Sequence, residues 1–180
     1  TSPVQVAQWG VFVTTPAVAK ESALVDVGIT LENKTAARVE PQVGVKIFAA
    51  DENGRPAGEA VAASEARKLR VEPARQASIS HTVSVASPKL WGLTERHRYV
   101  AETTISLDGE VVDRVLTPFG IRTIEHTADH GFLLNGERVQ LYGVCNHHDL
   151  GALGAAINTP ALVRQLGLLR EMGCDAIRTA

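Results

Sequence analysis

Hydrophobic and polar residues alternate with a period of two along most of the chain between residues 10 and 122. This is the period of a β-strand that buries one face and exposes the other. The clearest runs place mainly apolar residues at every second position: Val25, Val27, Ile29 and Leu31; Val43, Val45 and Ile47; Ala77, Ile79, His81, Val83 and Val85; and Tyr99, Ala101, Thr103, Ile105 and Leu107. The dipeptide Asp108-Gly109 follows the last run, and it favours a tight type I′ hairpin.

Together with an opening strand at residues 11–13, these runs predict seven or eight short strands. Turn residues separate them, for example at residues 51–54. Many short strands at regular spacing are typical of an antiparallel β-sandwich. We therefore predict a mainly β fold that begins with an immunoglobulin-like β-sandwich domain over residues 1–122.

The pattern changes over residues 123–180. Asn135-Gly136 predicts another hairpin, whose second strand continues to Cys145. Thr159 and Pro160 are predicted to start a helix as N-cap and first helical residue, and Gly173 to end it. Its apolar stripe consists of Leu162, Val163, Leu166, Leu169 and Met172. A strand over 174–179 then completes a βαβ unit with parallel strands. One such unit cannot bury both faces of a sheet, so we expect 123–180 to be the beginning of a second domain.

Composition and charge narrow the possible partners. The chain has 18 Lys and Arg against 20 Asp and Glu, without a basic stripe, which argues against nucleic acid and anionic membranes. No apolar run approaches the ~20 residues that span a bilayer. Aromatic residues make up only 4% of the chain. The apolar content therefore consists mainly of Val, Ala, Leu and Ile, which favours strands. The chain begins with Thr1 rather than Met, as expected for a piece of a longer protein.

The densest polar cluster is the stretch CNHHD at residues 145–149, after a predicted parallel strand. Loops at this end of strands are where α/β folds bind ligands. Alternation would place Cys145, His147 and Asp149 on one side if the strand extends that far. Contact with a substrate and ordinary packing of a loop are both possible roles for these side chains. A metal site is disfavoured because adjacent histidines rarely chelate one ion, and no HExxH motif is present.

Other candidate residues have simpler explanations. His81 is expected to be a hydrogen-bonded histidine at the edge of the core, and His126 and His130 solvated linker residues. Trp91 is expected to anchor a strand edge, with a sugar subsite as the alternative. The acidic residues of the C-terminal part offer no convincing pair for glycoside hydrolysis: Asp129, Glu137, Asp149, Glu171 and Asp175.

Four stretches in this order resemble glycoside hydrolase family 2. They are FGIR at 119–122, GFLLNGERV at 131–139, GVCNHHD at 143–149 and MGCDAIRT at 172–179. The segments HHDLG at 147–151 and GAA at 154–156 are closest in character to bacterial β-galactosidases. The resemblance implies an immunoglobulin-like domain followed by the first βαβ unit of a truncated (β/α)8 barrel, a fold that needs ~250 residues when complete.

The resemblance also implies roles for individual residues. His147 would end the first barrel strand and line the sugar pocket, and Asp149 would contact the sugar. Arg178 would end the second barrel strand and help to hold the nucleophilic carboxylate. Cys145 departs from the family, where Asn is common at this position. Neither catalytic glutamate is expected within the chain, so no catalytic residue, metal or cofactor is predicted here.

The expected parent protein is a retaining β-galactosidase that acts on terminal β-galactosides. The alternatives are a β-glucuronidase or β-mannosidase of the same family, or a non-catalytic immunoglobulin-like interaction or carbohydrate-binding module. The isolated chain is expected to be inactive and to self-associate through the apolar helix stripe. The resemblance favours a periplasmic or extracellular parent over a cytoplasmic one, although no residue of the chain encodes a location.

Overall fold

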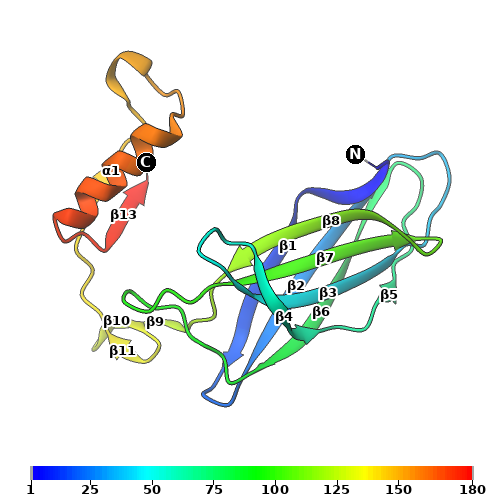
Figure 1. Ribbon diagram of the computed structural model, residues 1–180, viewed down its shortest axis with the longest axis horizontal. Coiled ribbons are helices and arrows are strands. Elements are labelled where there is room, and N and C mark those ends of the chain that lie inside the picture. The colour runs from blue at the N-terminus through cyan, green and yellow to red at the C-terminus, as the bar shows by residue number, and fades with distance from the viewer. Residues whose placement is uncertain (1, 180) are drawn as a thin grey trace. The chain divides into compact units, whose positions relative to one another are not determined.

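The computed structural model describes residues 2 to 179 and divides them into two compact units (Figure 1). Unit 1 is Thr1–Ile124 and unit 2 is Glu125–Ala180. The domain limits of 1–122 and 123–180 stay a prediction, because compactness alone does not show which segments fold independently.

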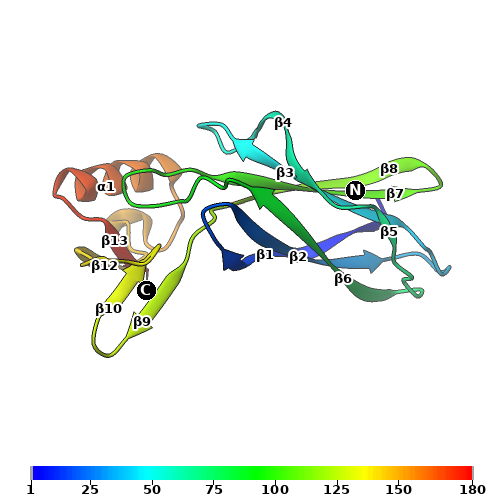
Figure 2. The ribbon, with the colours of Figure 1, turned by 90° about the horizontal axis from the view of Figure 1, so that it is seen from below.

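Unit 1 is built from two antiparallel sheets that face each other as layers (Figure 2). The three-stranded sheet has the order β1-β2-β6, with β1 at Val4–Val18, β2 at Ser22–Asn33 and β6 at Arg75–Ala86. The five-stranded sheet has the order β4-β3-β7-β8, and β5 also pairs with β3. Its strands are β4 (Pro56–Ala63), β3 (Gln42–Ala50), β7 (Tyr99–Leu107), β8 (Glu110–Phe119) and β5 (Arg67–Lys68).

The core lies between the two sheets and consists mainly of the residues that alternation assigns to the inner faces. One cluster joins them across the layers: Ala23, Val25, Val27, Ile29 and Leu31 of β2; Val43, Val45 and Ile47 of β3; Val83 and Val85 of β6; Tyr99, Ala101 and Ile105 of β7; and Val71 and Ile121 between strands. The predicted mainly β, immunoglobulin-like fold is therefore confirmed. Burial of these side chains from both sheets is the main favourable term in the folding of unit 1.

The hairpin prediction is also confirmed. Asp108 and Gly109 connect β7 to β8 with φ angles of 52° and 87°, as a type I′ turn requires. The first strand, in contrast, is much longer than residues 11–13. A bulge interrupts its pairing with β2 between Val6 and Val11, and Trp9 there has a φ of 57°. Because the bulge shifts the alternation, the pattern revealed only the second half of β1.

Unit 2 begins with a small antiparallel sheet in the order β11-β10-β9. Its strands are β9 (Ile124–Thr127), β10 (Gly131–Leu134) and β11 (Glu137–Arg138). Asn135 and Gly136 form the predicted turn with φ angles of 54° and 79°. His126 is exposed to solvent, as predicted, but it is not a linker residue: it lies in β9, and its ring packs 5.0 Å from the Phe132 ring.

The remainder of unit 2 is the predicted βαβ unit. β12 (Gly143–Asn146) and β13 (Ala176–Thr179) pair in parallel, and η1 (Gly151–Leu153) and α1 (Thr159–Glu171) lie between them in the chain. The N-cap of α1 is Asn158 rather than Thr159. Its backbone is extended, and its Oδ1 atom accepts a hydrogen bond from the Ala161 N–H at 3.1 Å. Gly173 follows the helix with a φ of 86°, as predicted.

Candidate functional site

The carboxyl edge of the β12–β13 pair is the candidate site in unit 2. In the parallel register Gly143 lies opposite Ala176, and Cys145 lies opposite Arg178. A Cβ atom on Gly143 would collide with the Ala176 carbonyl group. Glycine at this position therefore allows the two backbones to approach, which sets the register that brings Cys145 and Arg178 together.

A second contact holds the beginning of the two strands. The Oδ1 atom of Asp175 accepts a hydrogen bond from the Tyr142 N–H at 2.7 Å, and the Tyr142 carbonyl accepts from the Ala176 N–H at 3.1 Å. The sequence suggests Asp175 only as one of the carboxylates that could take part in glycoside hydrolysis. Its actual contact is structural, and the alternation pattern contains no signal for it because the partner is a backbone group distant in the chain.

Arg178 lies in β13 and is exposed. Its Nη1 atom donates a hydrogen bond to the Cys145 sulfur at 3.6 Å, within the range for a sulfur acceptor. This contact anchors one nitrogen of the guanidinium on the strand pair. An exposed, planar guanidinium with remaining donors suits a carboxylate, which it can bind through two parallel hydrogen bonds.

His147 and Asp149 lie beyond the end of β12, which stops at Asn146. The strand alternation that would place them on one side with Cys145 therefore does not extend to them. Both side chains are exposed. The Oδ1 atom of Asp149 accepts a hydrogen bond from the Gly151 N–H at 2.8 Å, so this carboxylate stabilises the start of its own loop. The structure thus joins Arg178 to Cys145 and places His147 and Asp149 in the loop that follows.

The described part of the chain, residues 2 to 179, contains no group of three or more His, Cys, Asp or Glu side chains that could hold a metal ion. Across the same residues, no helix has both the length and the apolar character needed to span a membrane.

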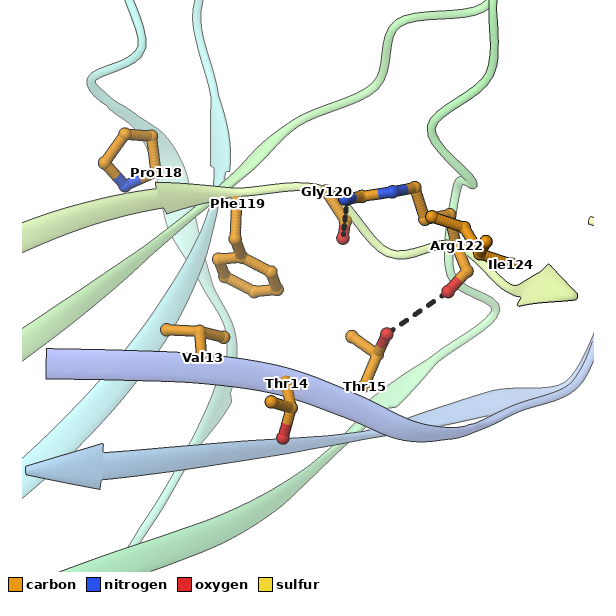
Figure 3. Close-up of a pocket in the computed structure, with 8 residues that line it drawn as sticks. All are labelled: Val13, Thr14, Thr15, Pro118, Phe119, Gly120, Arg122 and Ile124. Atoms are coloured by element: carbon orange, nitrogen blue, oxygen red, sulfur yellow. Dashed lines mark hydrogen bonds between the residues drawn. The ribbon is translucent and has the colours of Figure 1, made fainter. Parts of the chain in front are cut away.

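Three residues of the FGIR stretch, Phe119, Gly120 and Arg122, line a cleft of about 440 Å³ in unit 1 (Figure 3). The Phe119 side chain points toward Val13 of β1, and the Arg122 carbonyl accepts a hydrogen bond from the Thr15 hydroxyl at 3.3 Å. The Arg122 guanidinium lies 5.3 Å from the centre of the Trp91 ring, as in a cation–π contact. These contacts tie the end of β8 to β1 and to the loop that carries Trp91.

Trp91 itself serves as an anchor. Its backbone N–H donates a hydrogen bond to the Ile121 carbonyl at 2.8 Å. A Cβ atom on Gly120 would lie only 2.9 Å from the Trp91 side chain. Gly120 therefore leaves space for the indole ring, and the Arg122 guanidinium packs over that ring. This geometry favours the strand-edge reading of Trp91 over the sugar-subsite reading.

His81 is buried on β6, with 2% of its surface exposed. Burial, and secondarily the positive charge of Arg67, lower the pKa of His81 below its ordinary 6.5. Its Nε2 atom has no hydrogen-bond partner among the described residues, so the expectation of a hydrogen-bonded histidine fails for this atom. The structure therefore identifies His81 as a neutral core residue rather than a ligand.

The chain resembles known proteins in both sequence and structure. The model of glycosyl hydrolases family 2 matches residues 6–122. Beta-galactosidase BoGH2A of Bacteroides ovatus is 38% identical over 178 residues, which are 99% of this chain and 20% of that protein. A beta-glucuronidase of Bacteroides fragilis is 28% identical over 180 residues, covering 99% of this chain and 25% of that protein.

Among solved structures, a glycosyl hydrolase family 2 member from Bacteroides cellulosilyticus superposes with a TM-score of 0.88 at 30% identity. The match covers 100% of this chain and 24% of that one. The chain therefore spans a fifth to a quarter of the length of these relatives.

Proposed function

The chain belongs to glycosyl hydrolases family 2, and on this premise we propose that it is part of a retaining β-galactosidase. The observation that carries the proposal is the 38% identity to a beta-galactosidase over 99% of the chain, a match that includes both the sandwich and the βαβ unit. In this proposal the enzyme removes terminal β-galactosyl groups by double displacement. One carboxylic acid protonates the leaving oxygen, and a carboxylate forms the glycosyl-enzyme.

Unit 1 serves as the scaffold in this proposal, and the βαβ unit is the start of a (β/α)8 catalytic barrel. The parallel pairing of β12 and β13 supports this role, since sites in such barrels form at the carboxyl ends of the strands. The acidic residues of the chain make no convincing catalytic pair. We therefore assign the acid/base and the nucleophile to another part of the whole protein, and we expect the 180-residue chain alone to be inactive.

The loop after β12 and the end of β13 form one edge of the sugar pocket in this proposal. His147 and Asp149 contact the sugar, and Arg178 positions the nucleophilic carboxylate. The exposure of all three side chains supports these roles. Cys145 accepts a hydrogen bond from the Nη1 atom of this guanidinium.

A substrate panel on the whole protein tests the sugar. We expect aryl β-galactoside to have the highest kcat/KM, with aryl β-glucuronide and β-mannoside far lower, and the first-formed product to keep the β configuration. The second candidate is a β-glucuronidase, favoured by the Bacteroides fragilis relative that matches 99% of the chain. Preference for the glucuronide would establish it instead. A whole protein that hydrolyses none of these glycosides would favour a non-catalytic module.

Variants of the whole protein test the role of Arg178. Arg178→Ala should lower kcat about 100-fold, because a misplaced reacting group costs this much, while KM changes little. Arg178→Lys should restore part of the activity. Arg164→Ala, an exposed arginine on α1, is the matched control and should leave kcat unchanged. An Arg178→Ala enzyme with normal kcat would remove Arg178 from the site.

A further inference from the structure

The outer face of the β1-β2-β6 sheet exposes two aromatic side chains. Trp9 is 93% exposed and Phe12 is 73% exposed, the two highest values among the large hydrophobic residues of unit 1. Single exposed apolar residues are common on protein surfaces. Two neighbouring aromatic rings on one sheet face, in contrast, are typical of a surface that binds a ligand or a partner. The features around the two rings indicate what kind of ligand the face suits.

The neighbours of Phe12 leave its ring accessible. Phe12 pairs across the strands with Gly28, and Gly28 pairs with Ser80. Because Gly28 has no side chain, β2 places nothing beside the ring. The next row carries Thr30 and Ser78, whose hydroxyl oxygens lie 2.9 Å apart. The aromatic ring is thus followed along the face by small hydroxyl side chains.

Trp9 is held outward by the bulge in β1. Its φ of 57° lies in the left-handed region, which disfavours a bulky residue. The next residue must be small, since a Cβ atom on Gly10 would lie 2.7 Å from the carbonyl oxygens of Ala7 and Thr30. In contrast, the left-handed Asp108 and Asn135 occupy hairpin turns, where this conformation is required. Strain of this kind inside a strand is common at functional sites.

Trp9, Phe12, Thr30, Ser78 and Ser80 border a shallow cleft of about 410 Å³, which we call the aromatic face. None of the residues lining this cleft carries a charge. One row further along the sheet, the Asp26 carboxylate accepts a hydrogen bond from the Thr82 hydroxyl at 2.6 Å and is thereby occupied. The chemistry of the face therefore suits a neutral ligand with an apolar surface and several hydroxyl groups.

We propose that the aromatic face binds a neutral oligosaccharide. The C–H face of a pyranose ring stacks on the electron-rich face of Trp9 or Phe12. The ring hydroxyls exchange hydrogen bonds with Thr30, Ser78 and Ser80, whose hydroxyls both donate and accept. β2 lies in the middle of its sheet, so a polypeptide could add a further strand only at the edge strands β1 and β6, and not on the face that carries the cleft. The proposal rests on unit 1 alone and does not depend on which glycoside the whole enzyme hydrolyses.

The two tryptophans of the chain make a direct experiment possible. In the ¹⁵N-labelled 180-residue chain they give two indole N–H signals, and Trp9→Gly identifies the Trp9 signal by removing it. We expect cellotetraose or β-1,4-galactotetraose to shift the Trp9 signal in a saturable manner and to leave the Trp91 signal unchanged. A chain whose Trp9 signal responds to neither tetrasaccharide would overturn the proposal.

Three variants then locate the site by isothermal titration with the tetrasaccharide that binds. Trp9→Gly and Phe12→Ala should each weaken binding at least tenfold. Trp9→Gly should not lower the melting temperature, because glycine adopts the left-handed backbone without strain. Leu116→Ala, 44% exposed on β8, is the control and should bind like the parent chain. Full affinity in both aromatic variants, or a Trp9 signal that follows protein concentration rather than saccharide, would overturn the proposal in favour of another site or a second copy.

Discussion

The two units of the molecule bury their apolar residues to very different degrees. In unit 1 both sheets contribute to one continuous core, and Val25, Ile47 and Ile105 are essentially inaccessible. In unit 2, among the residues that the structure describes, Leu134 is the only buried apolar residue. All of α1 is described, and none of its residues is buried. The same chain therefore contains one unit with a complete core and one without.

The difference follows from the number of layers. Two sheets packed face to face bury the inner side of each, whereas one helix beside a two-stranded parallel pair leaves most of its apolar stripe uncovered. Val163 and Leu166 of α1 and its C-cap residue Met172 are more than half exposed. Unit 2 should accordingly be the less stable part of the chain. The self-association predicted through this helix stays a prediction, and light scattering of the 180-residue chain can measure it.

The largest effect expected from this contrast is in the core of unit 1. Ile29→Ala should lower the free energy of unfolding by about 2–5 kcal/mol, because it removes a fully buried side chain from between the sheets. Leu166→Ala on α1, where the leucine is 51% exposed, should change it by no more than about 0.5 kcal/mol. Urea unfolding followed by circular dichroism measures both. Equal losses would contradict the contrast, since they would require α1 to be packed as tightly as β2.

The next effect concerns a polar residue inside unit 1. Asn33 is fully buried, and its Nδ2 atom donates to the carbonyls of Ala37 and Val71 at 2.8 and 3.2 Å. Asn33→Ala should cost about 1–3 kcal/mol in unfolding free energy, because it removes the hydrogen bonds of a fully buried amide, including the one that its Oδ1 atom accepts from the Thr35 N–H at 2.9 Å. Asn53→Ala, at an exposed turn position, is the control and should be nearly neutral. An Asn33→Ala chain as stable as the parent would show that water replaces the amide.

A smaller effect should appear as the pH falls. The folded-state pKa of His81 lies below 6.5, so below that pH the unfolded chain binds more protons than the folded chain, and stability decreases until the folded-state pKa is passed. Above pH 6.5 both states are neutral at this residue and His81 contributes no pH dependence. His81→Leu should flatten this part of the stability profile. Identical profiles in parent and His81→Leu chains would refute the assignment.

The smallest effect should be confined to unit 2. Asn158→Ala removes the N-cap of α1 and should cost about 1 kcal/mol locally. Hydrogen exchange of the amides in the first turn should accelerate, while the amides of β2 keep their rates. Asn158→Ser should restore protection, since a serine hydroxyl can accept the same bond. Faster exchange in β2 as well would mean that the two units unfold together.

The sequence predicted the parts of the fold that depend on local rules. Alternation in β2, β3 and β7 identified the inner residues, and Asp108-Gly109 and Asn135-Gly136 located their turns because both dipeptides tolerate left-handed backbone. The bulge at Trp9 was missed because it breaks the alternation on which the prediction depends. The N-cap was placed one residue late, since Asn158 and Thr159 are both good capping residues and only the backbone angles distinguish them.

By itself, the sequence determined the strand periodicity, the turn positions and the order of the βαβ unit, because each depends on neighbouring residues. Only the tertiary structure decided which distant groups meet. The packing of Trp91 against Gly120 and Arg122 depends on where the segment after β8 meets the loop that carries Trp91. The contact of Arg178 with Cys145 and the row of Phe12, Gly28 and Ser80 depend on strand register. Register is set by pairing across the sheet, and residues far apart in the chain carry no local signal of it.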